Sequence, residues 1–375
     1  MTAKIVVTIN STGRQAASFV RVASAVGWHV RAQVRSREGI VAEELEALPN
    51  VKIFEGSLEG NPLLIEELFD GAQLAFINTT HWGDEVAIGR AVADAAQRAR
   101  VKHFVYSSMP DHSIYNQEWK ALPLWANKFT IENYIRQIGL PATFIYTGIY
   151  NNNFTSLPFP LFRMELQPDK KSFIWKAPFV PDEPLPWLDA EHDVGAAVLQ
   201  IFKQGVRRWG GHRIPLAFER LSPNEVCRLF SRALNMPVSY ERGPIEIFVP
   251  VPAGYREHLN VLEETLGEQE APYFGPELNR PSYPAEAVDL WEGYRGIEEY
   301  AREVFPLEEA ANGLRWMYDD DDDETTSSVK SDAEVGATGK LDSRPVTPGG
   351  EGDLGASARM GTKGTESQGF FTGNC

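Results

Sequence analysis

The chain has 375 residues, of which 43% are hydrophobic and 23% charged, so it is long enough to bury a sizeable core and to form two domains. Its formal net charge of −16 argues against direct binding of nucleic acid, because phosphate contacts require clustered Lys and Arg. The two cysteines, Cys227 and Cys375, exclude a disulfide framework and indicate a reducing compartment, and no run of about 18 apolar residues predicts a membrane span.

The first 150 residues alternate between short apolar runs and segments whose apolar residues recur at helical spacing. Strands are predicted at 5–9, 29–34, 51–54, 74–78, 104–108 and 142–146, with helices at 15–27, 41–48, 61–69, 84–100 and 125–138. Repeated βα units predict an α/β fold with a doubly wound parallel sheet of the Rossmann type. Beyond these units the pattern becomes irregular, and helices are predicted near 193–204, 222–234, 255–266 and 296–305.

We expect three regions along the chain. Residues 1–153 form a dinucleotide-binding Rossmann domain, and residues 154–318 form a smaller α/β domain with some elements returning to the first sheet. Residues 319–375 contain 10 Gly, 12 acidic and 5 basic residues, with two Phe as their only aromatic residues. Such a segment cannot bury enough apolar surface to offset its conformational entropy, so it is predicted to be a disordered acidic tail.

A polar turn joins the first strand to the first helix, and it reads Asn10, Ser11, Thr12, Gly13, Arg14 and Gln15, followed by Ala16. Turn-forming or small residues recur there at three-residue spacing, at Asn10, Gly13 and Ala16. Asn tolerates left-handed backbone geometry, Gly13 permits close approach of a phosphate, and Ala16 allows the helix to pack tightly on the strand. The pattern predicts that the turn binds the pyrophosphate of a dinucleotide; a purely structural turn is the alternative.

The end of the second strand decides between the two nicotinamide cofactors. An acidic residue there would bind the ribose 2′-hydroxyl, but the sequence offers Arg35, Ser36 and Arg37. Both arginines could pair with a 2′-phosphate, or they could be solvated surface residues. The lack of an acid predicts that NADP is accepted and leaves NAD possible.

The position of a catalytic tyrosine is occupied by leucine. Short-chain dehydrogenases donate a proton from a Tyr four residues before a Lys, and here Leu124 precedes Lys128. Ser107 and Ser108 close the fifth strand where such enzymes keep a catalytic hydroxyl. Leucine cannot transfer a proton, so Lys128 could hold the nicotinamide ribose without supporting redox chemistry. Three nearby residues could replace the missing tyrosine as proton donor: Tyr106, His112 and Tyr134.

Five segments resemble the NmrA-like family of fungal nitrogen metabolite repression regulators, an atypical branch of the short-chain dehydrogenase fold. They are 10–18, 75–80, 106–112, 148–154 and 186–195, and the resemblance runs through about residues 4–317. It implies a Rossmann domain with a smaller α/β domain, binding of oxidised NADP or NAD, and no working dehydrogenase. It also implies repression of nitrogen-catabolic genes through binding of a GATA-type zinc-finger activator.

The resemblance further implies which residues contact the nucleotide. Asn10 to Gln15 would contact the pyrophosphate. The adenosine side would be contacted by Arg35, Ser36, Arg37, Gly39, Gly56 and Ser57, and the nicotinamide side by Asn78, Thr79, Lys128, Asn151, Asn152, Asn153 and Phe154. The family has His in place of Arg35, so the preference between NADP and NAD stays open.

The acidic charge suits the implied partner, because a DNA-binding zinc finger is basic. The competing interpretation is that the charge only keeps the protein in solution. The expected function is therefore a non-enzymatic co-repressor in the nucleus and cytoplasm, with no direct nucleic-acid or membrane contact. The alternative is an NADPH-dependent reductase of the isoflavone-reductase-like type that uses Lys128.

Overall fold

The computed structural model describes residues 4–314 and 316. Residues 4–314 belong to one compact unit. The predicted acidic tail, 319–375, lies outside the described residues, and so does Cys375.

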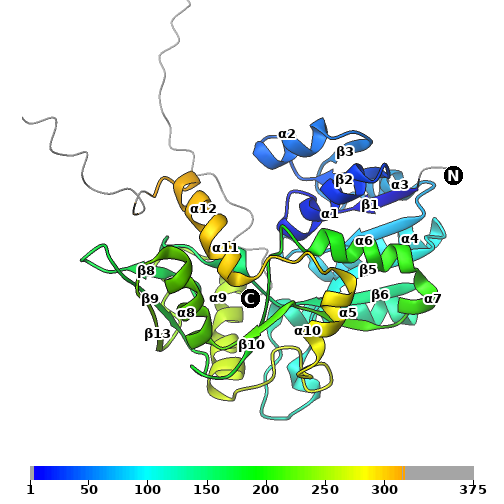
Figure 1. The fold of residues 1–375 in the computed structure, drawn as a ribbon. Helices are drawn as coiled ribbons and strands as arrows, with labels where there is room; N and C mark the ends of the chain where they lie inside the picture. The colour runs from blue at the N-terminus through cyan, green and yellow to red at the C-terminus, as the bar shows by residue number, and fades with distance from the viewer. Residues whose placement is uncertain (1–3, 315, 317–375) are drawn as a thin grey trace, which may run out of the picture. The chain divides into compact units, whose positions relative to one another are not determined.

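The largest sheet of this unit has seven parallel strands and lies on the right of Figure 1. Its strands are β1 (Ile5–Thr8), β2 (His29–Val34), β3 (Val51–Glu55), β4 (Leu74–Ile77), β5 (His103–Ser108), β6 (Ala142–Thr147) and β11 (Arg213–Leu216), in the spatial order β11-β6-β5-β4-β1-β2-β3. Every neighbouring pair is parallel. The predicted doubly wound fold is confirmed, and the six predicted strands end within one residue of their expected limits.

Two groups of helices cover the sheet, as the right-handed crossovers between parallel strands require. The first group is α1 (Arg14–Ala25), α2 (Ile40–Ala47), α6 (Val194–Gln204), α7 (Val206–Trp209) and α10 (Tyr283–Leu290), in which α1 packs on α2 and α6. The second is α3 (Pro62–Phe69), α4 (Glu85–Arg98) and α5 (Pro123–Gln137), with α4 between its neighbours. Buried side chains such as Phe19, Phe76 and Phe202 fill the core below α1 and α6.

Two small sheets follow the Rossmann units. One has the order β12-β10-β7, from β7 (Ile149–Tyr150), β10 (Leu185–Leu188) and β12 (Glu219–Leu221). The other has the order β13-β9-β8, from β8 (Met164–Leu166), β9 (Phe173–Ala177) and β13 (Val238–Arg242). The helices α8 (Pro223–Leu234), α9 (Ala253–Leu262), α11 (Ile297–Glu303) and α12 (Phe305–Ala311) belong to this later half of the chain.

Two predicted helices of this half are present, and the structure adds a feature to each. The helix expected at 255–266 ends as α9 at Leu262 and continues as a π-helix over Glu263–Glu268. The helix expected at 296–305 is present as α11, and a further helix that was not predicted, α12, begins directly after Val304. Pro306 stands at the start of α12, where the missing N–H and the fixed φ of proline favour a new helix over continuation of the old one.

A glycine sets the distance between α1 and α6. A Cβ on Gly195 would lie 2.4 Å from the carbonyl oxygen of Ser18, which is backbone and cannot swing away. The amide of Gly195 also donates to the Ser18 hydroxyl at 3.0 Å. The two helices lie side by side in Figure 1.

We therefore expect Gly195→Ala to lower the free energy of unfolding by about 1–3 kcal/mol, the usual cost of overpacking a core. The matched control is Gly254→Ala on α9, where a new Cβ meets open space. Thermal unfolding of the two variants and the parent measures the difference. Equal midpoints for Gly195→Ala and the parent would contradict the close approach.

Candidate functional site

The candidate site lies where the strand order reverses. β1 and β4 are neighbours in the sheet, and their chain connections leave in opposite directions, which opens a crevice at their carboxyl ends. The turn from Asn10 follows β1, and Asn78 and Thr79 follow β4. The predicted pyrophosphate residues and two of the predicted nicotinamide-side residues therefore meet at one edge of the sheet.

Asn10 has φ of +49°, the left-handed geometry expected of it from the sequence. Its amide donates to Gln33 Oε1 at 2.8 Å, and its side chain donates to the carbonyl of Asn78 at 3.1 Å. Gln33 in turn donates to the carbonyl of Gly56 at 2.7 Å. One glutamine at the end of β2 thus fixes the turn against the segment after β3.

Helix α1 begins directly behind this turn, with Gly13 as its N-cap residue. Gly13 has φ of −73°, an ordinary extended conformation, so any residue could occupy it without backbone strain. The first turn of α1 carries no acidic residue. Helix N-termini present N–H groups and a partial positive charge, so this end of α1 favours an anion.

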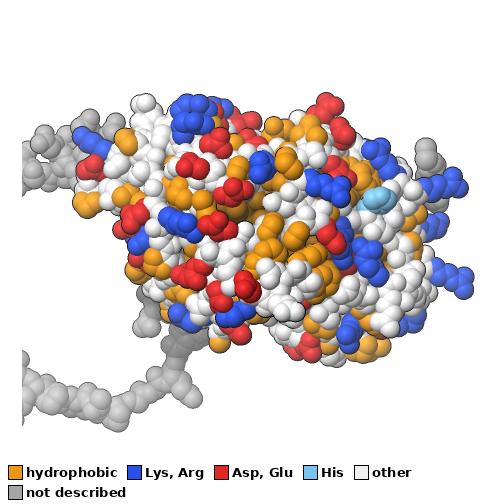
Figure 2. Space-filling view, turned by 90° about the horizontal axis from the view of Figure 1, so that it is seen from below, with side chains coloured by type: hydrophobic (Ala, Val, Ile, Leu, Met, Phe, Trp, Pro, Cys, Tyr) orange, Lys and Arg blue, Asp and Glu red, His pale blue; other side chains and the backbone are white. Residues whose placement is uncertain are grey.

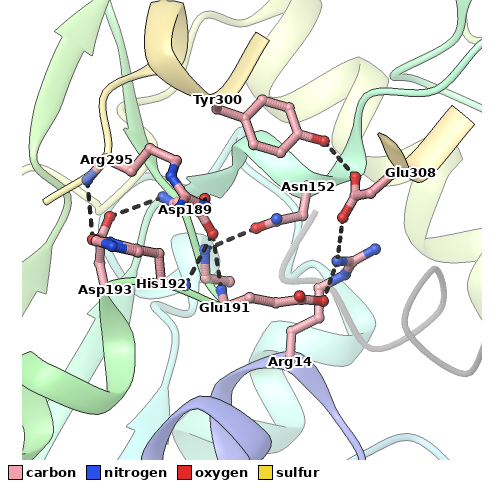
Figure 3. Close-up of polar contacts among 10 residues, drawn as sticks. Arg14, Asn152, Asp189, Glu191, His192, Asp193, Arg295, Tyr300 and Glu308 are labelled. Atoms are coloured by element: carbon pink, nitrogen blue, oxygen red, sulfur yellow. Dashed lines mark hydrogen bonds and ion pairs between the residues drawn. The ribbon is translucent and has the colours of Figure 1, made fainter. Parts of the chain in front are cut away.

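Arg14 connects the turn to distant segments (Figure 3). Its guanidinium contacts Glu191, and it donates to Glu308 Oε1 on α12 at 3.2 Å. Tyr300 on α11 donates to the other Glu308 oxygen at 2.6 Å. Burial alone would lower the pKa of Arg14. The carboxylates of Glu191 and Glu308 have the larger effect, so the pKa of Arg14 is raised. The turn is thereby tied to the last two helices of the described chain.

A second polar network, also drawn in Figure 3, holds the segment before α6. Asp189 is fully buried, accepts from the amides of Glu191 and His192, and pairs with Arg295 at 3.2 Å. Burial raises the pKa of Asp193 to about 6, although His192 contacts it at 2.6 Å. The network fixes the loop that carries Glu191.

A cleft of about 140 Å³ opens on the β2 side of the turn. It is lined by Asn10, Gln33, Arg35, Ser57, Leu58, Glu59, Thr80, Trp82, Gly83 and Ile88. Three predicted contact residues, Asn10, Arg35 and Ser57, therefore share one cleft. Most of the lining residues are polar or charged, so the cleft suits a polar ligand.

The two predicted arginines differ in their surroundings. Arg35 lines the cleft, with its guanidinium carbon 4.9 Å from the centre of the Trp82 ring. Arg37 contacts Glu46 and lies 3.5 Å from Glu55, so its charge is already paired. The Ser36 hydroxyl accepts from its own loop, at the Glu38 amide.

Two glycines complete the predicted adenosine side. Gly39 is the N-cap residue of α2, with φ of +120°. Gly56 has φ of +140°, and its carbonyl accepts from Gln33.

Lys128 joins the residues that follow β4. Its ammonium donates to Asn78 Oδ1 at 3.0 Å and to the carbonyl of Thr79 at 2.6 Å, and it lies 3.3 Å from Glu85 Oε1. Both charged side chains are buried, with 8% and 2% of their surface exposed. Burial lowers the pKa of Lys128, and the Glu85 carboxylate only partly opposes this. Three predicted nicotinamide-side residues thus form one cluster, completed by Glu85.

The loop after β7 brings buried amide groups to the site. Both polar atoms of the Asn151 side chain, and Gln15 Oε1 on α1, lack a hydrogen-bond partner within the described chain. The Asn152 oxygen accepts from the amide of Ala190 at 2.9 Å, and Asn153 is also buried. Buried polar groups are almost always satisfied, so orphaned ones indicate a missing ligand or water.

Phe154, predicted beside the nicotinamide, has its side chain in the core. It is 1% exposed and stacks on Trp187 at 5.6 Å, with Trp175 and Phe230 at its edges. Its ring packs in the core and fixes the loop that carries Asn151 to Asn153, so its role is to position that loop.

Each of the three candidate proton donors already has a hydrogen-bond partner. The Tyr106 hydroxyl lies 2.9 Å from Thr79 Oγ1, and burial, reinforced by Glu85, raises the pKa of Tyr106 well above its usual value. Tyr134 donates to Asp94, and His112 contacts the carbonyl of Pro272. Leu124 lies one turn before Lys128 on α5 and offers no proton.

Sequence reasoning missed Gln33, Trp82, Glu85 and Glu308 as site residues. Gln33 lies near the end of β2, and polar residues at the carboxyl ends of parallel strands are candidates for ligand binding, so the sequence could have indicated it. The other three are distant in sequence from the residues they contact.

Within the described residues, no group of three or more His, Cys, Asp or Glu is placed to hold a metal ion. In the same part of the chain, no helix is both long and apolar enough to cross a membrane.

Comparison with known proteins identifies the family. The model of the NmrA-like family matches residues 1–301, so the chain belongs to that family, and the resemblance seen in the sequence is confirmed. The nitrogen metabolite repression protein nmrA of Emericella nidulans is 58% identical over 348 residues, which cover 84% of this chain and 98% of that protein.

Two solved structures extend the match. Crystal structures of NmrA, a negative transcriptional regulator, in complex with NADP and with NAD each superpose with a TM-score of 0.81 at 58% identity. Each match covers 85% of this chain and the whole of the chain in the solved structure. The chain is thus similar over nearly all of its described residues to a regulator crystallised with either nucleotide.

Proposed function

We propose that this chain is a non-enzymatic co-repressor of nitrogen-catabolic genes, which binds NADP or NAD and docks on a GATA-type zinc-finger activator in the nucleus and cytoplasm. The observation that carries the proposal is the position of Lys128. The residue that assists proton transfer in dehydrogenases is here buried against Glu85, with Leu124 in place of the tyrosine.

The residues at the crevice fit a dinucleotide. The N-terminus of α1 suits a pyrophosphate, Arg35 can pair with a 2′-phosphate, and the orphaned amides of Asn151 and Gln15 suit a polar group such as a carboxamide. A bound nucleotide would supply hydride chemistry in an enzyme of this fold. Here the chain supplies binding groups for it without an evident proton donor.

Charge supports the partner. Residues 1–318 carry 31 basic and 40 acidic residues, so they are acidic without the tail. A basic zinc finger would be attracted to such a protein over long distances. Figure 2 shows acidic and basic side chains interspersed over one face, with apolar side chains between them. That face carries no large area of a single charge, so a docking surface is better sought elsewhere.

The reductase alternative rests on one observation. The Tyr106 hydroxyl, Thr79 and Lys128 form a continuous polar chain, since Lys128 also lies 3.5 Å from Thr79 Oγ1. A tyrosine near a lysine is the pair that dehydrogenases use, although the raised pKa of Tyr106 makes it a poor acid.

We expect no sustained oxidation of NADPH with a panel of carbonyl and enone substrates, because Leu124 stands in the place of the proton-donating tyrosine and burial raises the pKa of Tyr106. Loss of NADPH absorbance under steady-state conditions measures this directly. Turnover that persists in the parent and disappears in Lys128→Ala would replace the regulator with the reductase.

Complementation tests the repressor role. The chain is expressed in an Emericella nidulans strain that lacks its own nmrA. We expect nitrogen-catabolic genes to be repressed again when a preferred nitrogen source is present. Persistent expression of these genes, with the protein present at normal abundance, would contradict the proposal.

A further inference from the structure

Trp82 occupies an unusual position for a large aromatic residue in a loop. Its ring stacks on His81, with centroids 5.2 Å apart and an interplanar angle of 25°. The guanidinium of Arg35, which follows β2, lies over the same indole at 4.9 Å from its centre. Trp82 as a whole residue nevertheless remains 38% exposed, and it forms part of the wall of the cleft.

The loop that carries Trp82 is fixed by Glu59. Glu59 Oε1 accepts from the amide of Asp84 at 3.2 Å, and Asp84 then caps α4 by accepting from Ala87 at 2.9 Å. Gly83 has φ of +73°, and a Cβ there would lie 2.4 Å from the Glu59 carboxylate. Trp82 is thus held beside the cleft by a turn that requires glycine.

The cation–π contact has a direct consequence for Arg35. An exposed arginine samples many rotamers, and each must be given up when it binds a phosphate. A guanidinium held over an aromatic face by a cation–π contact has fewer conformations to lose. The arrangement therefore organises Arg35 in advance for an anion at the mouth of the cleft.

We propose that Trp82 is a positioning residue for the 2′-phosphate of NADP, and that through Arg35 it sets the preference for NADP over NAD. The inference rests on the proposed binding of nucleotides in this crevice. NAD has a hydroxyl where NADP has the phosphate, so it gains little from an organised guanidinium. Arg37 does not share this role, because Glu46 and Glu55 pair with its charge.

Calorimetric titration of the full-length protein with NADP and with NAD tests the proposal. We expect Trp82→Leu to lower the ratio of NADP to NAD affinity about two- to fivefold, the range given by a cation–π contact. Trp82→Phe keeps an aromatic face and should restore most of the ratio. Arg98→Gln is the matched control, because it removes an exposed arginine on α4 that pairs with Glu66 outside the cleft, and it should leave the ratio unchanged.

A double substitution separates positioning from simple packing. In an Arg35→Gln background, Trp82→Leu should no longer change the ratio, because the group it positions is gone. Equal losses for NADP and NAD in Trp82→Leu would show that the indole only forms a wall of the cleft, and would overturn this inference alone. A parent protein that binds neither nucleotide would overturn the proposed function and this inference together.

Discussion

Replacing Gly13 by Val should lower the affinity for NADP and for NAD at least tenfold, which is about 1.4 kcal/mol. Gly13 caps α1 at the point where a pyrophosphate would approach the backbone, and two added methyl groups would occupy that approach. Because Gly13 has an extended backbone that Val adopts readily, the fold should survive. The expected result is a stable protein that has lost its nucleotide.

Calorimetry with both nucleotides measures the loss, and thermal unfolding confirms that the variant is folded. Gly254→Val is the matched control, since it adds the same side chain in open space on α9. Equal nucleotide affinity in Gly13→Val and the parent would move the pyrophosphate site away from this turn.

The second large effect is expected at the buried ion pair. Glu85→Gln keeps the shape of the side chain but leaves the Lys128 ammonium buried with only neutral oxygens of Asn78 and Thr79. Breaking a buried pair on one side costs about 3–5 kcal/mol. Denaturant unfolding should show this loss, and the pKa of Lys128 should fall further below its usual value.

A double-mutant cycle isolates the pair. Lys128→Met removes the other charge while retaining a long, flexible side chain. The double variant should be more stable than Glu85→Gln alone, since it buries no unpaired charge. A double variant whose loss equals the sum of the two single losses would contradict the coupling of these residues.

The sheet and the turn could be predicted because their signals are local. The strands of the Rossmann sheet up to β6 are short segments rich in apolar or β-branched residues, and the turn at Asn10 follows the first of them directly. Strands β10 and β11 were not predicted, since each has four residues and contains a proline, Pro186 or Pro215. Their places depend on neighbouring strands that are distant in sequence.

Only part of the site could be predicted, because the rest depends on contacts between residues that are distant in sequence. Lys128, Asn78 and Thr79 were predicted through the family, but Glu85 reads in sequence as an ordinary acid in the first turn of α4. Arg35 and Arg37 look equivalent in sequence, and only their partners, Trp82 and the pair Glu46 and Glu55, distinguish them. Tertiary contacts decide which charges remain available to a ligand.

The tail raises a separate question of kinetics. Residues 319–375 carry a net charge of −7, and the remainder of the chain is itself acidic. A Gly-rich acidic composition makes docking costly in conformational entropy, but its charge could speed the encounter with a basic partner. Its removal should therefore change the association rate more than the final affinity, and added salt should shrink the effect.

Surface plasmon resonance with an immobilised GATA-type zinc finger tests the central claim most directly. The full-length protein and a form that ends at Tyr318 are compared at two ionic strengths, with and without NADP or NAD. We expect both forms to bind saturably, with slower association of the truncated form at low salt. Absence of binding by the full-length protein would contradict the co-repressor function, and loss of binding only on truncation would place the docking site in the tail.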